Sequence, residues 1–91
     1  MTMVYSAEHP LDDVALPGRV RVEAEADEFW GGAESRPYRS RTMLNPTWGR
    51  LMKCAEAQAK KTLDEQHVFL EDFEIVRIDG DVSVIRLFLG S

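Results

Sequence analysis

The sequence lacks the features of several protein classes. Its 91 residues contain a single cysteine, Cys54, so neither an internal disulfide nor a cysteine-rich zinc site can form. No stretch approaches the ~20 consecutive apolar residues that a membrane helix requires. The first residues show neither the basic segment nor the apolar core of a secretory signal peptide. We therefore expect a cytoplasmic protein, of bacterial origin, that has no membrane partner.

Motifs for cofactor binding and for nucleophilic catalysis are also missing. The paired glycines Gly31 and Gly32 are not followed by a helix that begins with a lysine, as a phosphate-binding loop requires. No serine stands in a nucleophile-elbow context. On a helical wheel Cys54 falls outside the apolar stripe, and nothing in the sequence places a base beside it. These absences disfavour catalysis, and we expect no cofactor.

The composition indicates one small folded domain. Hydrophobic residues make up 44% of the chain and charged residues 30%, which is typical of a soluble globular protein. The length is that of a single domain, so we assign residues 1–91 to one domain. Within it, residues 1–18 are expected to form an extended lead-in, which Pro10, Pro17 and Gly18 interrupt.

Two segments in the first half of the chain have the patterns of strands. Residues 19–26, RVRVEAEA, alternate strictly between apolar and charged side chains, which predicts a half-buried strand. Residues 35–44 are extended at best, because Pro37 excludes a central strand and permits an edge strand.

The segment after Asn45 predicts an amphipathic helix. Asn45 is a preferred N-cap residue, and Pro46 suits the first helical position. The helix should end near Leu63, because Asp64 and Glu65 would oppose its negative C-terminal pole. Apolar side chains recur at intervals of three and four residues and form one stripe: Trp48, Leu51, Met52, Ala55, Ala59, Thr62 and Leu63.

The C-terminal third predicts a β-hairpin. Residues 67–78 and 81–90 are rich in β-branched and aromatic side chains, and Asp79-Gly80 between them suits a two-residue type I′ turn. The element order β-(β)-α-β-β predicts an α+β fold, with one amphipathic helix packed on a small antiparallel sheet. In the predicted register three pairs of residues face each other: Ile78 and Asp81, Ile75 and Val84, and Phe73 and Arg86.

Charge is distributed unevenly along the chain, whose net charge is -5. Residues 36–61 contain seven basic residues and one acid, which gives +6 and leaves -11 for the rest. Arginines interleaved with a tyrosine can clamp phosphates and stack bases, although an acidic domain repels a polyanion beyond such a patch. The alternative is a solvated helix face. The candidate residues for binding nucleic acid or another anion are Arg36, Tyr38, Arg39, Arg41, Arg50, Lys53, Lys60 and Lys61.

A second candidate site lies where the helix is expected to meet the hairpin. Asp64, Glu65 and His67 fall at this junction, and two carboxylates with an imidazole can hold a divalent metal ion. Their spacing matches no established metal motif, so the opposing interpretation is a solvated acidic strand edge. The spacing favours the acidic edge over the metal site.

The hairpin also predicts self-association. In the predicted register neither of its sides is polar, and one helix can cover only one side. The other side would be a large apolar patch on a monomer, whereas a two-fold dimer would bury it. A bulge that switches the faces midway, or coverage by the lead-in, would instead permit a monomer. The candidate interface residues are Val84, Ile85, Leu87 and Leu89.

Three functions follow from these features. The leading prediction is a non-catalytic protein-interaction domain that forms a homodimer through the hairpin. The first alternative is a nucleic-acid-binding module that uses residues 36–61. The second alternative is a small metal-dependent enzyme centred on Asp64, Glu65 and His67.

Overall fold

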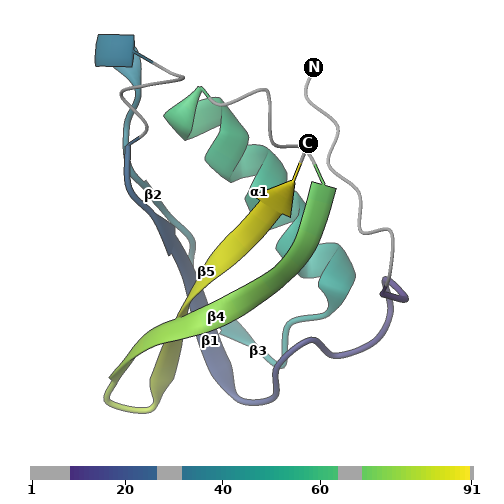
Figure 1. The fold of residues 1–91 in the computed structure, drawn as a ribbon. Coiled ribbons are helices and arrows are strands. Elements are labelled where there is room, and N and C mark those ends of the chain that lie inside the picture. The colour runs from purple at the N-terminus through teal and green to yellow at the C-terminus, as the bar shows by residue number, and fades with distance from the viewer. Residues whose placement is uncertain (1–8, 27–31, 64–68, 91) are drawn as a thin grey trace.

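The α+β fold predicted from the sequence is confirmed by a computed structural model of the chain, which describes residues 9–26, 32–63 and 69–90. The described part contains one α-helix, a short 3-10 helix at Gly32–Glu34 and a mixed sheet of five strands (Figure 1). The last two strands form the C-terminal hairpin that the sequence predicts. The helix packs against one face of the sheet, as expected.

The strands are β1 (Arg19–Ala24), β2 (Tyr38–Arg39), β3 (Met43–Leu44), β4 (Phe69–Asp79) and β5 (Val82–Gly90). They are arranged in the order β2-β1-β5-β4, and β3 also pairs with β1. The sheet differs from the antiparallel one predicted, because β1 and β5 pair in parallel. A parallel pair requires a long crossover connection, and the helix and β4 supply it here.

The helix α1 (Trp48–Thr62) begins two residues later than predicted. Its N-cap is Thr47, whose Oγ1 accepts a hydrogen bond from the Arg50 backbone N–H at 3.2 Å. Asn45 is therefore not the cap. Instead its side-chain Oδ1 accepts from Gly18 N–H at 2.6 Å, which joins the chain before β1 to the chain before the helix. The predicted end is confirmed, because Leu63 adopts the left-handed conformation (φ 60°) that terminates many helices.

The N-terminal lead-in, as far as it is described, covers the start of this helix. The Trp48 N–H donates to the Asp13 carbonyl at 3.0 Å, and the Gly49 N–H donates to the Leu11 carbonyl at 2.9 Å. These are N–H groups that a helix cannot satisfy internally. A Cβ at position 49 would lie 3.1 Å from the Leu11 carbonyl oxygen, so glycine permits the close approach.

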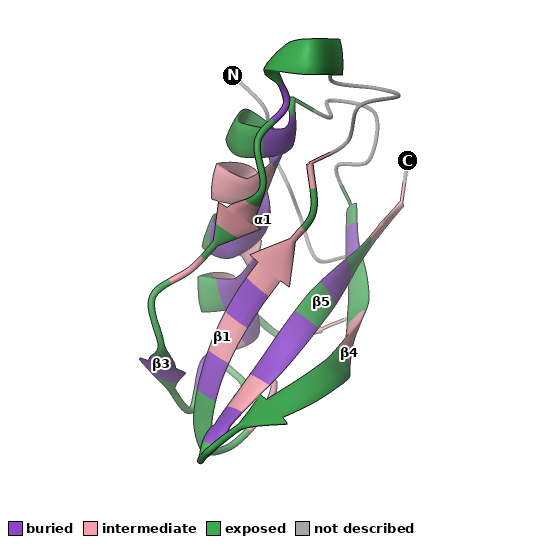
Figure 2. Cartoon of the chain, turned by 90° about the vertical axis from the view of Figure 1, so that its left-hand side faces the viewer, coloured by how far each residue is buried: buried purple, intermediate pink, exposed green. Residues whose placement is uncertain are grey.

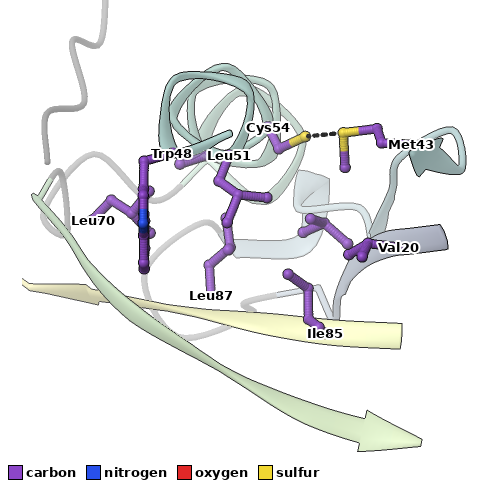
Figure 3. Close-up of a cluster of buried hydrophobic side chains, with 10 residues drawn as sticks. Val20, Met43, Trp48, Leu51, Cys54, Leu70, Ile85 and Leu87 are labelled. Atoms are coloured by element: carbon purple, nitrogen blue, oxygen red, sulfur yellow. Dashed lines mark hydrogen bonds between the residues drawn. The ribbon is translucent and has the colours of Figure 1, made fainter. Parts of the chain in front are cut away.

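The main core lies between α1 and the sheet (Figure 3). Trp48 and Leu51 on the helix point toward Leu70 and Leu87 on the hairpin. The expectation that Cys54 lies off the apolar face is wrong, because its side chain is buried and its Sγ donates to Met43 Sδ at 3.8 Å. The buried members of this core are Val20, Val22, Met43, Trp48, Leu51, Cys54, Ala55, Leu70, Ile85 and Leu87.

The hairpin turn is displaced by one residue from the predicted position. Its central residues are Gly80 and Asp81, since Asp79 already pairs with Val82. Only Gly80 has a positive φ (61°), which fits a type II′ turn with glycine first and not the type I′ turn predicted. Asp79 thereby becomes the last residue of β4.

Two bulges in β4 then change the register along the hairpin. The register shifts between Ile75 and Arg77 and again between Leu70 and Asp72. Each bulge adds one residue to β4 and bends the strand. Because the turn is displaced, Ile78 pairs with Ser83 and not with the predicted Asp81. Beyond the first bulge the difference falls to one residue, so Ile75 pairs with Ile85 and Phe73 with Leu87.

Candidate functional site

The predicted metal-binding residues Asp64, Glu65 and His67 lie outside the described residues. Across ranges 9–26, 32–63 and 69–90, no three or more histidine, cysteine, aspartate or glutamate residues gather as a metal site would require. The same ranges contain no helix that is long and apolar enough to cross a membrane.

The eight predicted anion-binding residues do not form one surface. Arg39 Nε lies 3.2 Å from Glu23 Oε2, so its charge is already compensated. Arg36 donates to the backbone carbonyls of Ala33 and Ser35, each at 3.0 Å. Lys60 and Lys61 lie in the last turn of α1, where cations interact favourably with the helix dipole.

The other four predicted residues lie around a shallow depression. Arg50 and Lys53 stand one turn apart on α1, and Arg41 lies between β2 and β3. No ion-pair partner of these three cations is found in the part of the chain that the structure describes. The depression has a volume of about 190 Å³ and is lined by Tyr38, Ser40, Arg41, Met43, Arg50, Lys53 and Cys54.

The wall of this depression is held by hydrogen bonds. Ser40 Oγ accepts from Val22 N–H at 2.8 Å and donates to the Arg41 carbonyl at 2.8 Å, which fixes the backbone that carries Arg41. Cys54 Sγ donates to Met43 Sδ at 3.8 Å, and both residues line the depression. The depression therefore has a fixed lining, with the cations at its rim.

The Cys54 thiol is not activated as a nucleophile. Burial raises the pKa of the thiol, although the hydrogen bond from Tyr38 and the charge of Arg50 act in the opposite direction. Burial also raises the pKa of the Tyr38 phenol, and the neighbouring Cys54 adds to that effect. Both groups therefore remain protonated and neutral at pH 7. Because the thiolate is the nucleophilic form, this site does not favour cysteine chemistry.

On the face of the sheet away from α1, four side chains form a closed ring of ion pairs. Arg21 lies 2.8 Å from Glu23 and 2.9 Å from Asp79, and Arg77 lies 2.9 Å from Glu23 and 3.3 Å from Asp79. Burial alone would raise the pKa of the Glu23 carboxyl. The hydrogen bonds from Arg77, Arg21 and Arg39 outweigh that effect and lower the pKa below its ordinary value of 4.5.

This ring explains how the second face of the hairpin is covered. Val84 pairs with Arg21 on one side and with Arg77 on the other, so the three side chains share a face. The apolar stems of the two arginines can flank Val84 while the guanidinium groups reach the carboxylates. Val84 is fully buried as a result, within a single copy of the chain.

A cavity of about 510 Å³ opens beside the ring. Its size falls within the usual range for small-molecule sites. The guanidinium groups at the cavity are already paired, Arg39 and Arg77 with Glu23 and Arg86 with Glu74. The three arginines of the cavity therefore have little uncompensated charge to offer an anionic ligand. It is lined by Glu23, Ala24, Glu25, Pro37, Tyr38, Arg39, Val76, Arg77 and Arg86.

The candidate interface residues occupy the interior of the chain. Val84, Ile85 and Leu87 are buried, and Leu89 is partly buried. Exposed apolar side chains instead lie along β4, where Ile75, Val76 and Ile78 are 49%, 44% and 59% exposed. Sequence reasoning missed these three because the displaced turn and the bulges decide which β4 side chains are covered.

Comparisons with protein-family models, with curated proteins and with solved structures found no match to this chain. The candidate sites are therefore interpreted from their own geometry: the rim of cations at the depression, and the exposed edge of β4.

Proposed function

We propose that this chain is a protein-interaction domain that forms a two-fold homodimer through the outer edge of β4. One observation carries the proposal. β4 is the outermost strand on its side of the described sheet, and three of its apolar side chains are 44–59% exposed. An unpaired strand edge with exposed apolar residues is a template for pairing with another chain.

The two edges of the sheet are unequal in length. β4 has 11 residues, whereas β2 and β3 at the other edge have two residues each. Among the described strands, β4 offers the longer row of backbone groups to a partner strand, although the Glu71 carbonyl is already contacted by His9 Nε2 at 3.3 Å. Main-chain hydrogen bonds along such a strand give affinity, and the side chains between them give specificity.

The charges of β4 are mostly acidic. The strand carries Glu71, Asp72, Glu74 and Asp79 and one cation, Arg77, which already pairs with Glu23 and Asp79. Like charges that face each other across two strands are unfavourable. The proposed contact between two copies therefore rests on the backbone groups of the edge and on the exposed apolar side chains.

The proposed contact differs from the interface predicted from the sequence. Val84, Ile85 and Leu87 are already covered within one copy, by α1 or by the ring of ion pairs. The dimer is therefore proposed to use the exposed β4 residues Ile75, Val76 and Ile78, which contribute little to the core of the monomer.

Light scattering coupled to gel filtration tests the dimer. We expect the wild-type chain to be dimeric at micromolar concentration and Ile78→Lys to be a folded monomer, because a lysine on the edge opposes strand pairing. Leu44→Lys is the matched control, since Leu44 is 73% exposed on β3 at the opposite edge and its variant should remain dimeric. A wild-type chain that stays monomeric at high micromolar concentration would contradict the proposal.

Nucleic-acid binding is the second candidate function, and the three unpaired cations at the depression favour it. Each phosphate that such cations neutralise releases counterions, so binding should weaken steeply with added salt. Fluorescence anisotropy with a labelled single strand at about 50 mM salt tests it, because phosphate contacts are strongest at low salt. The net charge of -5 opposes a long polyanion beyond the three cations.

A further inference from the structure

We propose that the depression between β2, β3 and α1 binds the phosphate group of an anionic ligand, which Arg41, Arg50 and Lys53 hold. This inference does not depend on the dimer, because the depression is lined by residues from β2, β3 and α1, and β3 and β4 lie at opposite edges of the sheet (Figure 2). Of the eight residues predicted to bind an anion, the proposal keeps the three cations that line this depression.

The charges around the depression are uncompensated. Arg50 and Lys53 stand at i and i+3 on α1, where like charges repel. None of the described residues that line the depression is a carboxylate. A bound anion would relieve this repulsion and would accept charge-assisted hydrogen bonds from two separate elements of the fold.

Other described cations are engaged differently. Arg19, Arg21, Arg39, Arg77 and Arg86 each pair with a carboxylate. Those arginines have little remaining charge to offer a ligand. Arg36, Lys60 and Lys61 also have no carboxylate partner among the described residues, but they do not line the depression. The contrast therefore favours the depression as a place where several uncompensated cations could hold one negative group.

The size of the depression limits which part of a ligand it can hold. Small-molecule sites usually measure about 300–1,000 Å³, whereas this depression measures about 190 Å³. A phosphate group fits in that space, but a whole nucleotide does not. The remainder of the ligand would therefore project into solvent, as with a small phosphorylated molecule or one phosphate of a nucleic-acid strand.

Nuclear magnetic resonance titrations of the ¹⁵N-labelled full chain test the proposal. The three probes are inorganic phosphate, a nucleoside monophosphate and a single-stranded oligonucleotide, with sodium chloride matched for ionic strength. We expect saturable shifts of the backbone amides of Arg41, Arg50 and Lys53 with phosphate and none of comparable size with chloride.

Two lysine variants distinguish phosphate binding at the depression from a general attraction of phosphate to the positive charge of the helix. Lys53→Gln should weaken phosphate binding about threefold to fivefold, the effect of losing one exposed ion pair. Lys60→Gln removes the same charge from an exposed position of the same helix, away from the lining, and should leave the affinity unchanged. Thermal unfolding of both variants checks that they remain folded.

The three probes also distinguish the source of the phosphate. Equal affinities for phosphate and the monophosphate, with no tighter binding of the oligonucleotide, support a small phosphorylated ligand. Tighter, salt-sensitive binding of the oligonucleotide that Lys53→Gln weakens supports a nucleic-acid strand held at the same site. Shifts that do not saturate, or equal losses in Lys53→Gln and Lys60→Gln, would overturn the proposal.

Discussion

Val84 and Ile85 are neighbours in β5, and both are fully buried, yet they lie on opposite faces of the sheet and are covered in different ways. Ile85 lies under α1 in the apolar core. Val84 lies between Arg21 and Arg77, whose guanidinium groups bind Glu23 and Asp79. A strand that is apolar on both sides can thus be accommodated by one helix and a layer of arginines.

The two faces should respond to different solution conditions. The apolar core is stabilised by removal of side chains from water, and this effect does not depend on the charge state of any group. The ring of ion pairs depends on ionised carboxylates and is partly screened by salt. The same sheet should therefore have one face that is insensitive to pH and salt and one that is sensitive.

The largest expected effect is on the helix-covered face. Ile85→Ala removes a fully buried side chain from the core, and we expect it to lower the free energy of unfolding by about 3–4 kcal/mol. Urea unfolding followed by circular dichroism measures it. Leu44→Ala, at a position that is 73% exposed and outside the proposed dimer contact, should cost less than about 1 kcal/mol. Equal losses in the two variants would contradict the assigned burial.

A smaller loss is expected on the opposite face. Val84→Ala removes two methyl groups from beneath the arginine stems, which should lower the free energy of unfolding by about 2 kcal/mol. Flexible arginine stems can close part of the space that is left, so the loss should be smaller than for Ile85→Ala. The same urea titrations give this value. A loss below about 0.5 kcal/mol would show that Val84 is not buried in a single copy.

The smallest effect, and the one that depends on pH, concerns Glu23. Glu23→Gln should lower the free energy of unfolding by about 1 kcal/mol at pH 7, because it weakens hydrogen bonds to three arginines. The folded state lowers the pKa of Glu23, so its contribution is present above the ordinary value of 4.5 and is lost as the pH falls through the folded pKa.

The difference between wild type and Glu23→Gln should accordingly be constant near neutral pH and decrease below pH 4.5. Urea titrations at several pH values, repeated at high salt, measure this difference. Glu25→Gln is the control, because Glu25 is exposed and has no arginine partner within the described residues. A difference that grows on acidification would contradict the proposed origin of the pKa shift.

Local patterns in the sequence were sufficient to predict several elements of the fold. The alternation in RVRVEAEA predicts β1, in which Val20 and Val22 are fully buried. The helical stripe predicts α1 and its end at Leu63. Local preference favours Asn45 as the helix cap, but its side chain binds the Gly18 N–H, which lies 27 residues away in the sequence and is not accessible to local preferences.

The candidate sites depended more strongly on distant contacts. The sequence shows the excess of basic residues between positions 36 and 61. It does not show which of them pair with a carboxylate in the folded chain. Arg39 binds Glu23 across two strands, whereas Arg41, Arg50 and Lys53 meet at one depression. Only the pairing of β1 with β2 and the packing of α1 decide this division.

The sequence by itself determined the fold class, the amphipathic helix and the presence of a hairpin, because each depends on a repeat of two to four residues along the chain. Only the tertiary structure decided which hairpin residues are buried. The parallel pairing of β5 with β1 places Val84 beside Arg21, and the displaced hairpin turn places Arg77 on its other side. Side chains from β1 and β4 together cover Val84, and no local periodicity encodes the approach of two strands that lie more than 50 positions apart in the sequence.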